Sequence, residues 1–197
     1  MRFSAMTDAK AEKELVGCSV LIADEDTYIS RILASVLAAF DLGSVEEVHS
    51  FEEAVSVLRH QDVSCLIVDW MDDGGSGLEL VNYVRRDENS INPQIPIILL
   101  TARTELSSIY AARDHGVSEI IAKPFSAAEM LKKLLAGLIR GRPFIEMDAY
   151  IGPDRRRRNR PWNGPERRGS YGLHQEQIDD VMREPRSQDD QGDAASG

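Results

Sequence analysis

The chain alternates between short apolar runs and longer stretches in which apolar residues recur at helical spacing. Uninterrupted apolar runs of about five residues are typical of strands buried on both faces of a parallel sheet. One of the segments, residues 45–48, is short and more polar, as expected of an edge strand. The predicted strands are residues 19–23, 45–48, 65–68, 96–100 and 117–122.

Helical patterns follow the strands. Apolar residues between positions 29 and 40 recur every three or four residues, and Gly43 can end that helix. Three further helices open with a serine followed three residues later by a glutamate, the capping-box pattern. These pairs are Ser50 with Glu53, Ser76 with Glu79 and Ser126 with Glu129.

One more helix carries Leu106, Ile109 and Tyr110 and ends at Gly116. The chain therefore reads as five strands alternating with five helices. Right-handed crossovers then give a parallel sheet covered on both faces. We predict an α/β, doubly wound (βα)5 fold with strand order 2-1-3-4-5, which leaves the polar second strand at an edge.

Polar residues follow four of the predicted strands. Asp24 and Glu25 come after the first, Asp69 after the third, Thr101 after the fourth and Lys123 after the fifth. Each has an ordinary explanation as a helix cap, a strand end or a solvated charge. In the predicted order, however, these four strands are adjacent, so their carboxyl ends bring the residues to one patch. We interpret this patch as a shared functional site.

The chemistry of these residues points to phosphoryl transfer. Three carboxylates close together require a cation, and Mg²⁺ prefers oxygen ligands completed by water. A carboxylate such as Asp69 can act as a nucleophile toward phosphorus. The Lys123 ammonium and the Thr101 hydroxyl could stabilise the transferred charge, and the small Ala102 leaves room for the phosphoryl group.

Residues 19–140 resemble a CheY-like receiver domain of the response-regulator family, which has the flavodoxin-like fold and serves two-component phosphorelay signalling. The matching stretches are 20–25, 66–69, 77–80, 99–102 and 121–125. The resemblance implies that Asp69 is the phosphoacceptor, forming a 4-aspartylphosphate, with Asp24, Glu25 and Asp69 as ligands of Mg²⁺. The backbone carbonyl of Met71 would be a further ligand.

By the same resemblance Thr101 is the switch hydroxyl and Lys123 the phosphate partner, and the bond before Pro124 is expected to be cis. Two positions depart from the family. Ile120 stands where an aromatic switch residue is usual, and Asp73 stands where a proline is usual. We therefore expect intact phosphorylation chemistry but a non-standard route for the signal.

Composition limits the remaining possibilities. The 197 residues carry a formal net charge of −10, which argues against the whole molecule being a nucleic-acid binder. No run is long and apolar enough for a membrane span or a secretory signal, so we expect a cytoplasmic protein. Cys18 and Cys65 suit reduced, buried thiols. The four histidines lack the spacing of metal ligands.

The ends of the chain read differently. Residues 1–18 form a polar leader. Beyond Leu138 we expect no further strand or helix, and residues 141–197 read as a low-complexity tail, Arg-rich and then acidic. A five-residue pattern starting at Gly152 recurs at Gly164. The tail is expected to be disordered, although its arginines could bind nucleic acid, an acidic partner or the receiver itself.

We therefore predict a phosphoacceptor switch and not a turnover enzyme. Its implied partners are a histidine kinase or histidine phosphotransfer protein and an unknown downstream protein. The latter would bind the face formed by the helix after Thr101, strand 117–122 and the helix after Ser126. A homodimer could also form on phosphorylation. No helix-turn-helix is visible.

A haloacid-dehalogenase-type phosphohydrolase is the alternative from another class. It would use Asp24 as nucleophile and Asp26 as acid/base. Tyr28 occupies a position where such enzymes usually carry Thr or Val, and Asp69 would be left without a role.

Overall fold

The computed structural model describes residues 13–70 and 76–155, and all of them fall in one compact unit. Strands and helices alternate along the chain as predicted. Short 3-10 turns lie at Lys13–Leu15 and Ala38–Phe40. The alternating elements are β1 Ser19–Ala23, α2 Thr27–Leu37, β2 Ser44–Val48, α3 Phe51–His60, β3 Cys65–Asp69, α4 Ser76–Arg86, β4 Ile97–Thr101, α5 Leu106–Asp114, β5 Glu119–Ala122 and α6 Ala127–Leu138.

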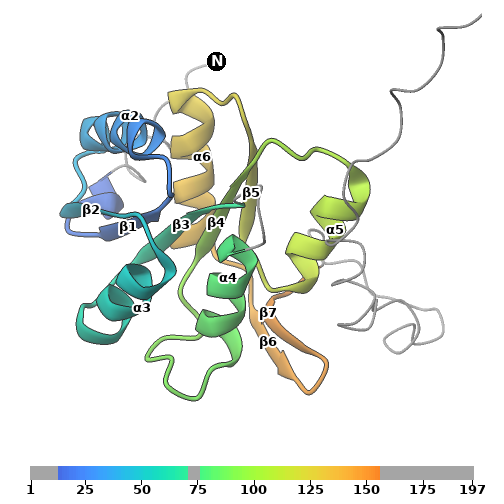
Figure 1. Ribbon diagram of the computed structural model, residues 1–197. Coiled ribbons are helices and arrows are strands. Elements are labelled where there is room, and N and C mark those ends of the chain that lie inside the picture. Colours follow the sequence, from blue (N-terminus) through green and yellow to red (C-terminus); the bar gives the residue numbers. More distant parts are fainter. Residues whose placement is uncertain (1–12, 71–75, 156–197) are drawn as a thin grey trace, which may run out of the picture. The chain divides into compact units, whose positions relative to one another are not determined.

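The five strands form one parallel sheet in the order β2-β1-β3-β4-β5, so the predicted doubly wound topology is confirmed. Helices α2 and α6 cover one face, and α3, α4 and α5 lie on the other (Figure 1). The polar strand β2 lies at the sheet edge, as expected. All carboxyl ends of the strands therefore point to the same side of the molecule.

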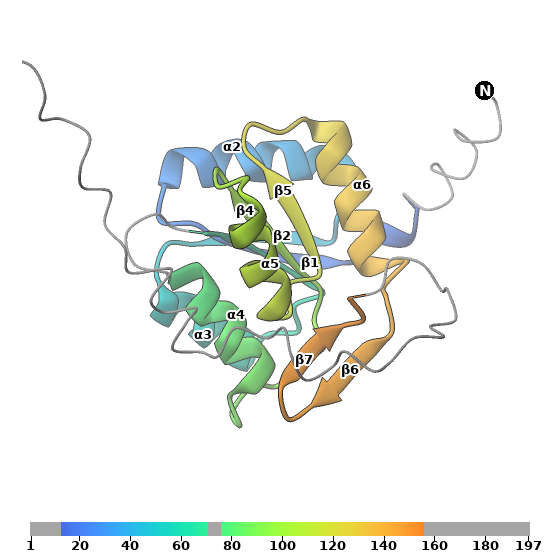
Figure 2. The ribbon, with the colours of Figure 1, turned by 90° about the vertical axis from the view of Figure 1, so that its right-hand side faces the viewer.

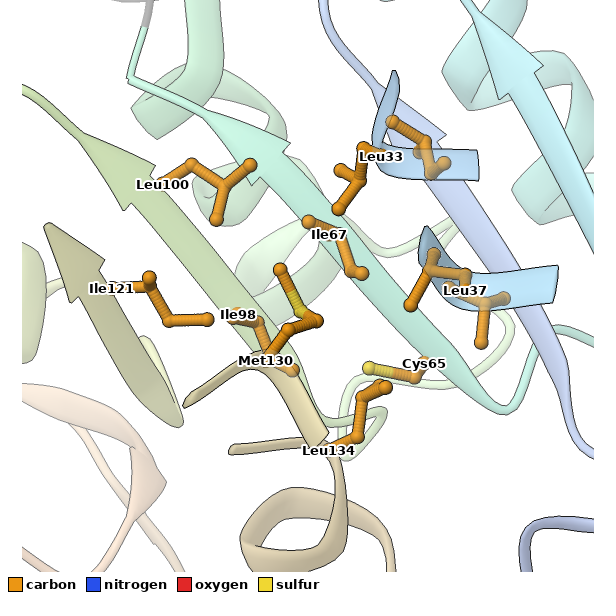
Figure 3. Packing of buried hydrophobic residues seen from close by; sticks show 11 residues of the cluster. Leu33, Leu37, Cys65, Ile67, Ile98, Leu100, Ile121, Met130 and Leu134 are labelled. Carbon is orange, nitrogen blue, oxygen red and sulfur yellow. The ribbon is translucent and has the colours of Figure 1, made fainter. Parts of the chain in front are cut away.

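The core on the α2 and α6 side is built from the strands' apolar runs. Leu33 and Leu37 of α2 and Met130 and Leu134 of α6 point onto the strand side chains (Figure 3). These four side chains are at most 1% exposed. Burial of strands on both faces explains why β3 and β4 read as unbroken apolar runs.

Two of the three predicted serine caps are confirmed, and the side chain of the third serine, Ser76, lies outside the described part of the structure. The Ser50 and Ser126 hydroxyls accept hydrogen bonds from the backbone N–H of Glu53 and Glu129. The Glu53 carboxylate accepts from the His49 backbone N–H, which closes the first turn of α3. These local patterns fixed the starts of both helices.

The end of α2 differs from the prediction. Its regular turns stop at Leu37, and Asp41 takes the left-handed conformation, with φ 59°, that ends the following 3-10 turn. Gly43 does not end the helix. A Cβ at Gly43 would lie 2.7 Å from the Gly17 Cα, so this glycine is needed for a close backbone contact.

The chain beyond Leu138 also differs from the prediction. Strands β6 Phe144–Met147 and β7 Tyr150–Pro153 pair antiparallel as a hairpin. The expectation of no strand after Leu138 is therefore wrong for these residues. Figure 2 shows the hairpin after the end of α6 and beside α4. Residues 156–197, which carry the rest of the predicted tail, lie outside the described residues.

The hairpin contacts the body of the domain through Phe144 and Arg142, and Arg142 also joins its two ends. The Arg85 guanidinium lies 5.4 Å from the centre of the Phe144 ring. Arg142 donates to the carbonyls of Asp154, at 2.7 Å, and Ser118. Two four-residue strands form a marginal hairpin by themselves, so these contacts are what makes it stable.

No helix in the described part of the chain has the length and apolar character needed to span a membrane.

Candidate functional site

The carboxyl edge of the sheet brings the predicted site residues together. Asp24 follows β1, Asp69 ends β3, Thr101 ends β4 and Lys123 follows β5. In the register, Asp69 pairs with Leu100 and Thr101 with Ala122, so the ends of these strands lie side by side.

Lys123 connects two of the carboxylates. Its Nζ lies 2.8 Å from Asp69 Oδ1 and 3.7 Å from Asp24 Oδ2. The Asp24 side chain is 2% exposed, whereas those of Asp69 and Lys123 are 19% and 25% exposed. Asp69 is therefore reachable from solvent, while Asp24 lies beneath it at the base of the site.

Only one of the two carboxylate oxygens of Asp24 has a hydrogen-bond partner. Its Oδ1 accepts from the Asp26 backbone N–H at 2.9 Å, whereas the buried Oδ2 has no hydrogen-bond partner. The Asp24 carbonyl lies 2.9 Å from His49 Nδ1, which positions the loop after β1. Burial raises the pKa of the Asp24 carboxyl above its ordinary value; the hydrogen bond from Asp26 opposes this and the Asp69 charge adds to it. A cation beside Oδ2 would relieve this electrostatic cost.

Thr101 is buried at the edge of the site. Its hydroxyl oxygen accepts from the Arg103 N–H at 2.9 Å, and the hydroxyl donates to the Arg103 carbonyl at 3.4 Å. The hydroxyl is thus bonded to the loop that leads into α5. Any new acceptor for its proton would change how this loop is held.

Sequence reasoning missed one neighbour of the site. Trp70 directly follows Asp69 and is 2% exposed, and the Arg103 guanidinium lies 5.8 Å from the centre of its ring. This contact joins the loop after β3 to the loop after β4. Both residues adjoin predicted site residues, but only the fold shows that they meet.

The structure describes some of the remaining predicted features of the site and leaves others outside the described residues. Glu25 is exposed, and Met71 and Asp73 lie outside the described residues. The Lys123–Pro124 bond is cis, as the resemblance implied. Ile120 lies half-buried in β5.

The donor set can be compared with the needs of Mg²⁺. In the ranges 13–70 and 76–155, no three His, Cys, Asp or Glu side chains group together as a metal site. Two carboxylates do converge, and Mg²⁺ commonly binds through one or two carboxylates with water or phosphate oxygens completing the octahedron. The unpartnered Asp24 Oδ2 is a suitable donor. Asp24 and Asp69 therefore fit a Mg²⁺ ion, and ligation by Glu25 stays a prediction.

Solved structures of other proteins share this fold. A putative response regulator from Chloroflexus aurantiacus superposes with a TM-score of 0.57 and 28% identity, covering 62% of this chain and 98% of that one. The chemotaxis protein CheY4 of Vibrio cholerae has the same TM-score at 24% identity, covering 62% of this chain and all of the other, and shows the fold alone. The fold is thus that of CheY-like receiver domains.

The sequence comparisons are more specific. Residues 20–135 match the family described as the response regulator receiver domain. The chain belongs to this family and so to the proteins of two-component signalling.

Two curated relatives show how far the similarity extends. The phosphate regulon transcriptional regulatory protein PhoB of Pseudomonas aeruginosa is 33% identical over 131 residues, which are 66% of this chain and 55% of PhoB. The chemotaxis protein CheY-3 of Vibrio cholerae is 29% identical over 115 residues, 58% of this chain and 87% of CheY-3. The chain thus spans about half the length of PhoB.

Proposed function

We propose that this protein is a phosphorylation switch that accepts a phosphoryl group on Asp69 with the help of Mg²⁺. Phosphoacceptor chemistry and Mg²⁺ use are general features of the family. The observation that carries the proposal for this chain is the contact of Lys123 Nζ with Asp69 Oδ1, next to the buried Asp24. A candidate nucleophile, a cationic partner and a candidate metal ligand thus meet at one edge of the sheet, which supports the proposal.

The residues support the transfer step as follows. An Asp69 carboxylate oxygen attacks phosphorus and forms the new P–O bond, while the bond from phosphorus to the donor breaks and the donor keeps the electron pair. Mg²⁺, when bound by Asp24 and Asp69, supplies positive charge for the phosphoryl oxygens. The Lys123 ammonium and the Thr101 hydroxyl stabilise the remaining oxygens.

The rival hydrolase assignment lacks this support. It requires Asp26 as an acid/base, but the Asp26 carboxylate accepts from the backbone N–H groups of Tyr28 and Ile29, at 2.9 and 3.1 Å. Asp26 is the N-cap of α2. Because Asp26 has this structural role, a phosphoacceptor switch accounts for more of the site than a turnover enzyme does.

The proposal extends to the partners and the domain limits. The phosphodonor is a histidine kinase or a histidine phosphotransfer protein, and the signal leaves by protein–protein contacts on the face of α5, β5 and α6. On this face Leu106 and Tyr110 are 67% and 49% exposed. We take residues 19–140 as the receiver and add the hairpin as its extension, with the Arg-rich and acidic segment as an accessory.

The test is intact mass after incubation with acetyl phosphate and Mg²⁺. Wild type is expected to gain one phosphate, and Asp69→Asn to gain none. Asp62→Asn, which changes an exposed aspartate at the opposite end of β3, is the matched control and should behave as wild type. If no adduct forms, beryllofluoride replaces the donor. Unchanged Thr101 and Lys123 amide signals with beryllofluoride and Mg²⁺ would refute the proposal.

A further inference from the structure

Helix α5 is lightly anchored to the sheet. The side chains that it buries are Ala111 and Ala112, while Leu106 and Tyr110 are largely exposed. Its N-cap residue, Glu105, makes no side-chain capping bond. A helix that buries so little apolar surface gains little from packing, so its position depends on contacts at its two ends.

The N-terminal end of α5 is tied to the phosphorylation site. The Thr101 hydroxyl is bonded to the backbone of Arg103, three residues before the helix begins. A hydroxyl has one proton to donate. If Thr101 donates that proton to a phosphoryl oxygen on Asp69, its bond to the Arg103 carbonyl is lost.

The C-terminal end of α5 is tied to the β6–β7 hairpin. Asp114, the last residue of α5, pairs with Arg155 at 3.3 Å and with its chain neighbour Arg113 at 3.1 Å. The Arg155 guanidinium also lies 3.9 Å from the centre of the Tyr150 ring, so β7 and α5 share this one side chain. We call the set of Asp114, Arg155 and Tyr150 the clasp.

Beside the clasp the two backbones are in direct contact. A Cβ at Gly116 would lie 2.3 Å from the Ile151 carbonyl oxygen, and a Cβ at Gly152 would lie 2.6 Å from the Gly116 Cα. Both glycines have positive φ, 91° and 156°. Such close packing leaves no space for the two segments to move against each other while they remain in contact.

The hairpin is also held by elements other than α5. Arg85 of α4 stacks on Phe144, and Arg142 donates to the carbonyl of Ser118, which precedes β5. Arg85 is itself fixed by bonds to the carbonyls of Gly116, Pro93 and Ile95. The hairpin therefore cannot follow a shift of α5 freely, and such a shift must strain the clasp.

We propose that the clasp is the output device of this receiver: phosphorylation of Asp69 displaces α5, weakens the Asp114–Arg155 contact and loosens the hairpin. This inference rests on the proposed function. Arg155 is the first of four consecutive arginines in the sequence, so loosening the clasp releases the first side chain of this basic stretch. The device offers a route for the signal that does not use an aromatic side chain at position 120.

Hydrogen exchange of the full chain, with and without beryllofluoride and Mg²⁺, tests the proposal. Amides in peptides covering residues 144–153 are expected to exchange about tenfold faster with beryllofluoride, within the usual range of allosteric coupling. Amides of residues 102–106 serve as the positive control. They belong to the loop after Thr101, so their exchange rate should change whenever beryllofluoride binds at Asp69.

Asp114→Asn removes the charge of the carboxylate that pairs with Arg155, and with its chain neighbour Arg113, while keeping the size of the side chain. In this variant the hairpin amides should exchange rapidly even without beryllofluoride. Their exchange rate should rise less than about twofold when beryllofluoride is added. Glu119→Gln is the matched control, because it removes one carboxylate charge from the Glu119–Lys133 pair between β5 and α6. It should respond as wild type does.

Linkage supplies a second readout. If phosphorylation weakens the clasp, a weakened clasp must favour the activated arrangement by the same factor. Asp114→Asn is therefore expected to bind beryllofluoride about tenfold more tightly than wild type, and Glu119→Gln equally tightly.

Two results would overturn the inference in distinguishable ways. If residues 102–106 respond to beryllofluoride and the hairpin does not, the clasp plays no part in output and the proposed function stands. If neither segment responds, the proposed function fails and the inference fails with it.

Discussion

The ammonium nitrogen of Lys123 lies 2.8 Å from Asp69 Oδ1 and 3.7 Å from Asp24 Oδ2, so one lysine contacts both carboxylates. A cation already present in the protein thus partly neutralises two carboxylates that a divalent ion would use. Lys123 and Mg²⁺ contribute charge of the same sign to one small volume. If Mg²⁺ binds here as proposed, the repulsion between the two cations lowers the affinity of the site for the metal, while both favour an incoming phosphoryl group.

This relationship gives a prediction for Lys123→Met. Mg²⁺ should bind roughly tenfold more tightly, because the competing charge is gone and the site remains partly shielded from solvent. Calorimetric titration with Mg²⁺ measures the change. Lys133→Met, which removes a lysine paired with Glu119 outside the site, should leave the affinity unchanged. Weaker binding in Lys123→Met would show that Lys123 positions the carboxylates and does not compete with the metal.

The close backbone contact at the hairpin predicts a sharp difference between two glycine variants. Gly152→Ala should lower the free energy of unfolding by about 2 kcal/mol, because the new Cβ would overlap the Gly116 Cα. Gly137→Ala, in α6, meets its nearest neighbour at an ordinary 3.4 Å and should be neutral or stabilising by up to about 1 kcal/mol. Urea unfolding measures both. Equal effects in the two variants would contradict the packing described at Gly152.

The hairpin also predicts where the chain can be shortened. A chain ending at residue 155 should keep the stability of the full protein. One ending at residue 140 should lose several kcal/mol, because Arg85 loses its stacking on Phe144 and Ser118 loses a hydrogen bond from Arg142. Thermal unfolding of the two shortened chains measures the difference. The same melting temperature for both would mean that the hairpin adds nothing to the domain.

Cys65 predicts a loss of stability at alkaline pH. Burial raises the pKa of its thiol to about 12, from 9.0 for a free thiol. Between these values the unfolded state has released a proton that the folded state retains. The free energy of unfolding should therefore fall with rising pH, by up to about 1.4 kcal/mol per pH unit from this group.

Substitution of each cysteine isolates this effect. Cys65→Ala should reduce the slope of stability against pH between about 9 and 12. Cys18→Ala should keep most of the slope, because burial is the larger cause of the raised Cys65 pKa and the Cys18 charge the smaller. Burial likewise raises the pKa of Tyr150, so part of the alkaline loss will persist in both variants. An unchanged slope in Cys65→Ala would assign the whole effect to other groups.

The amino-acid sequence by itself determined the strand order and which polar residues follow neighbouring strands at the carboxyl edge of the sheet. Apolar runs such as that of β3 and capping serines such as Ser50 act within a few residues, so their signals survive in the sequence. Topology then places Asp24, Asp69, Thr101 and Lys123 at one edge, because parallel strands all end there.

Only the tertiary structure decided the features that depend on contacts between distant residues. Strands β6 and β7 are only four residues long, and β7 contains Gly152 and Pro153, which are typical of loops. They are held by Arg85, Arg142 and the glycine contact at Gly116. The sequence also did not reveal that α5 buries little apolar surface, because Leu106 and Tyr110 recur at helical spacing but are exposed in the folded chain. Local patterns indicate which elements form, whereas the partners of each element depend on distances that only the folded chain sets.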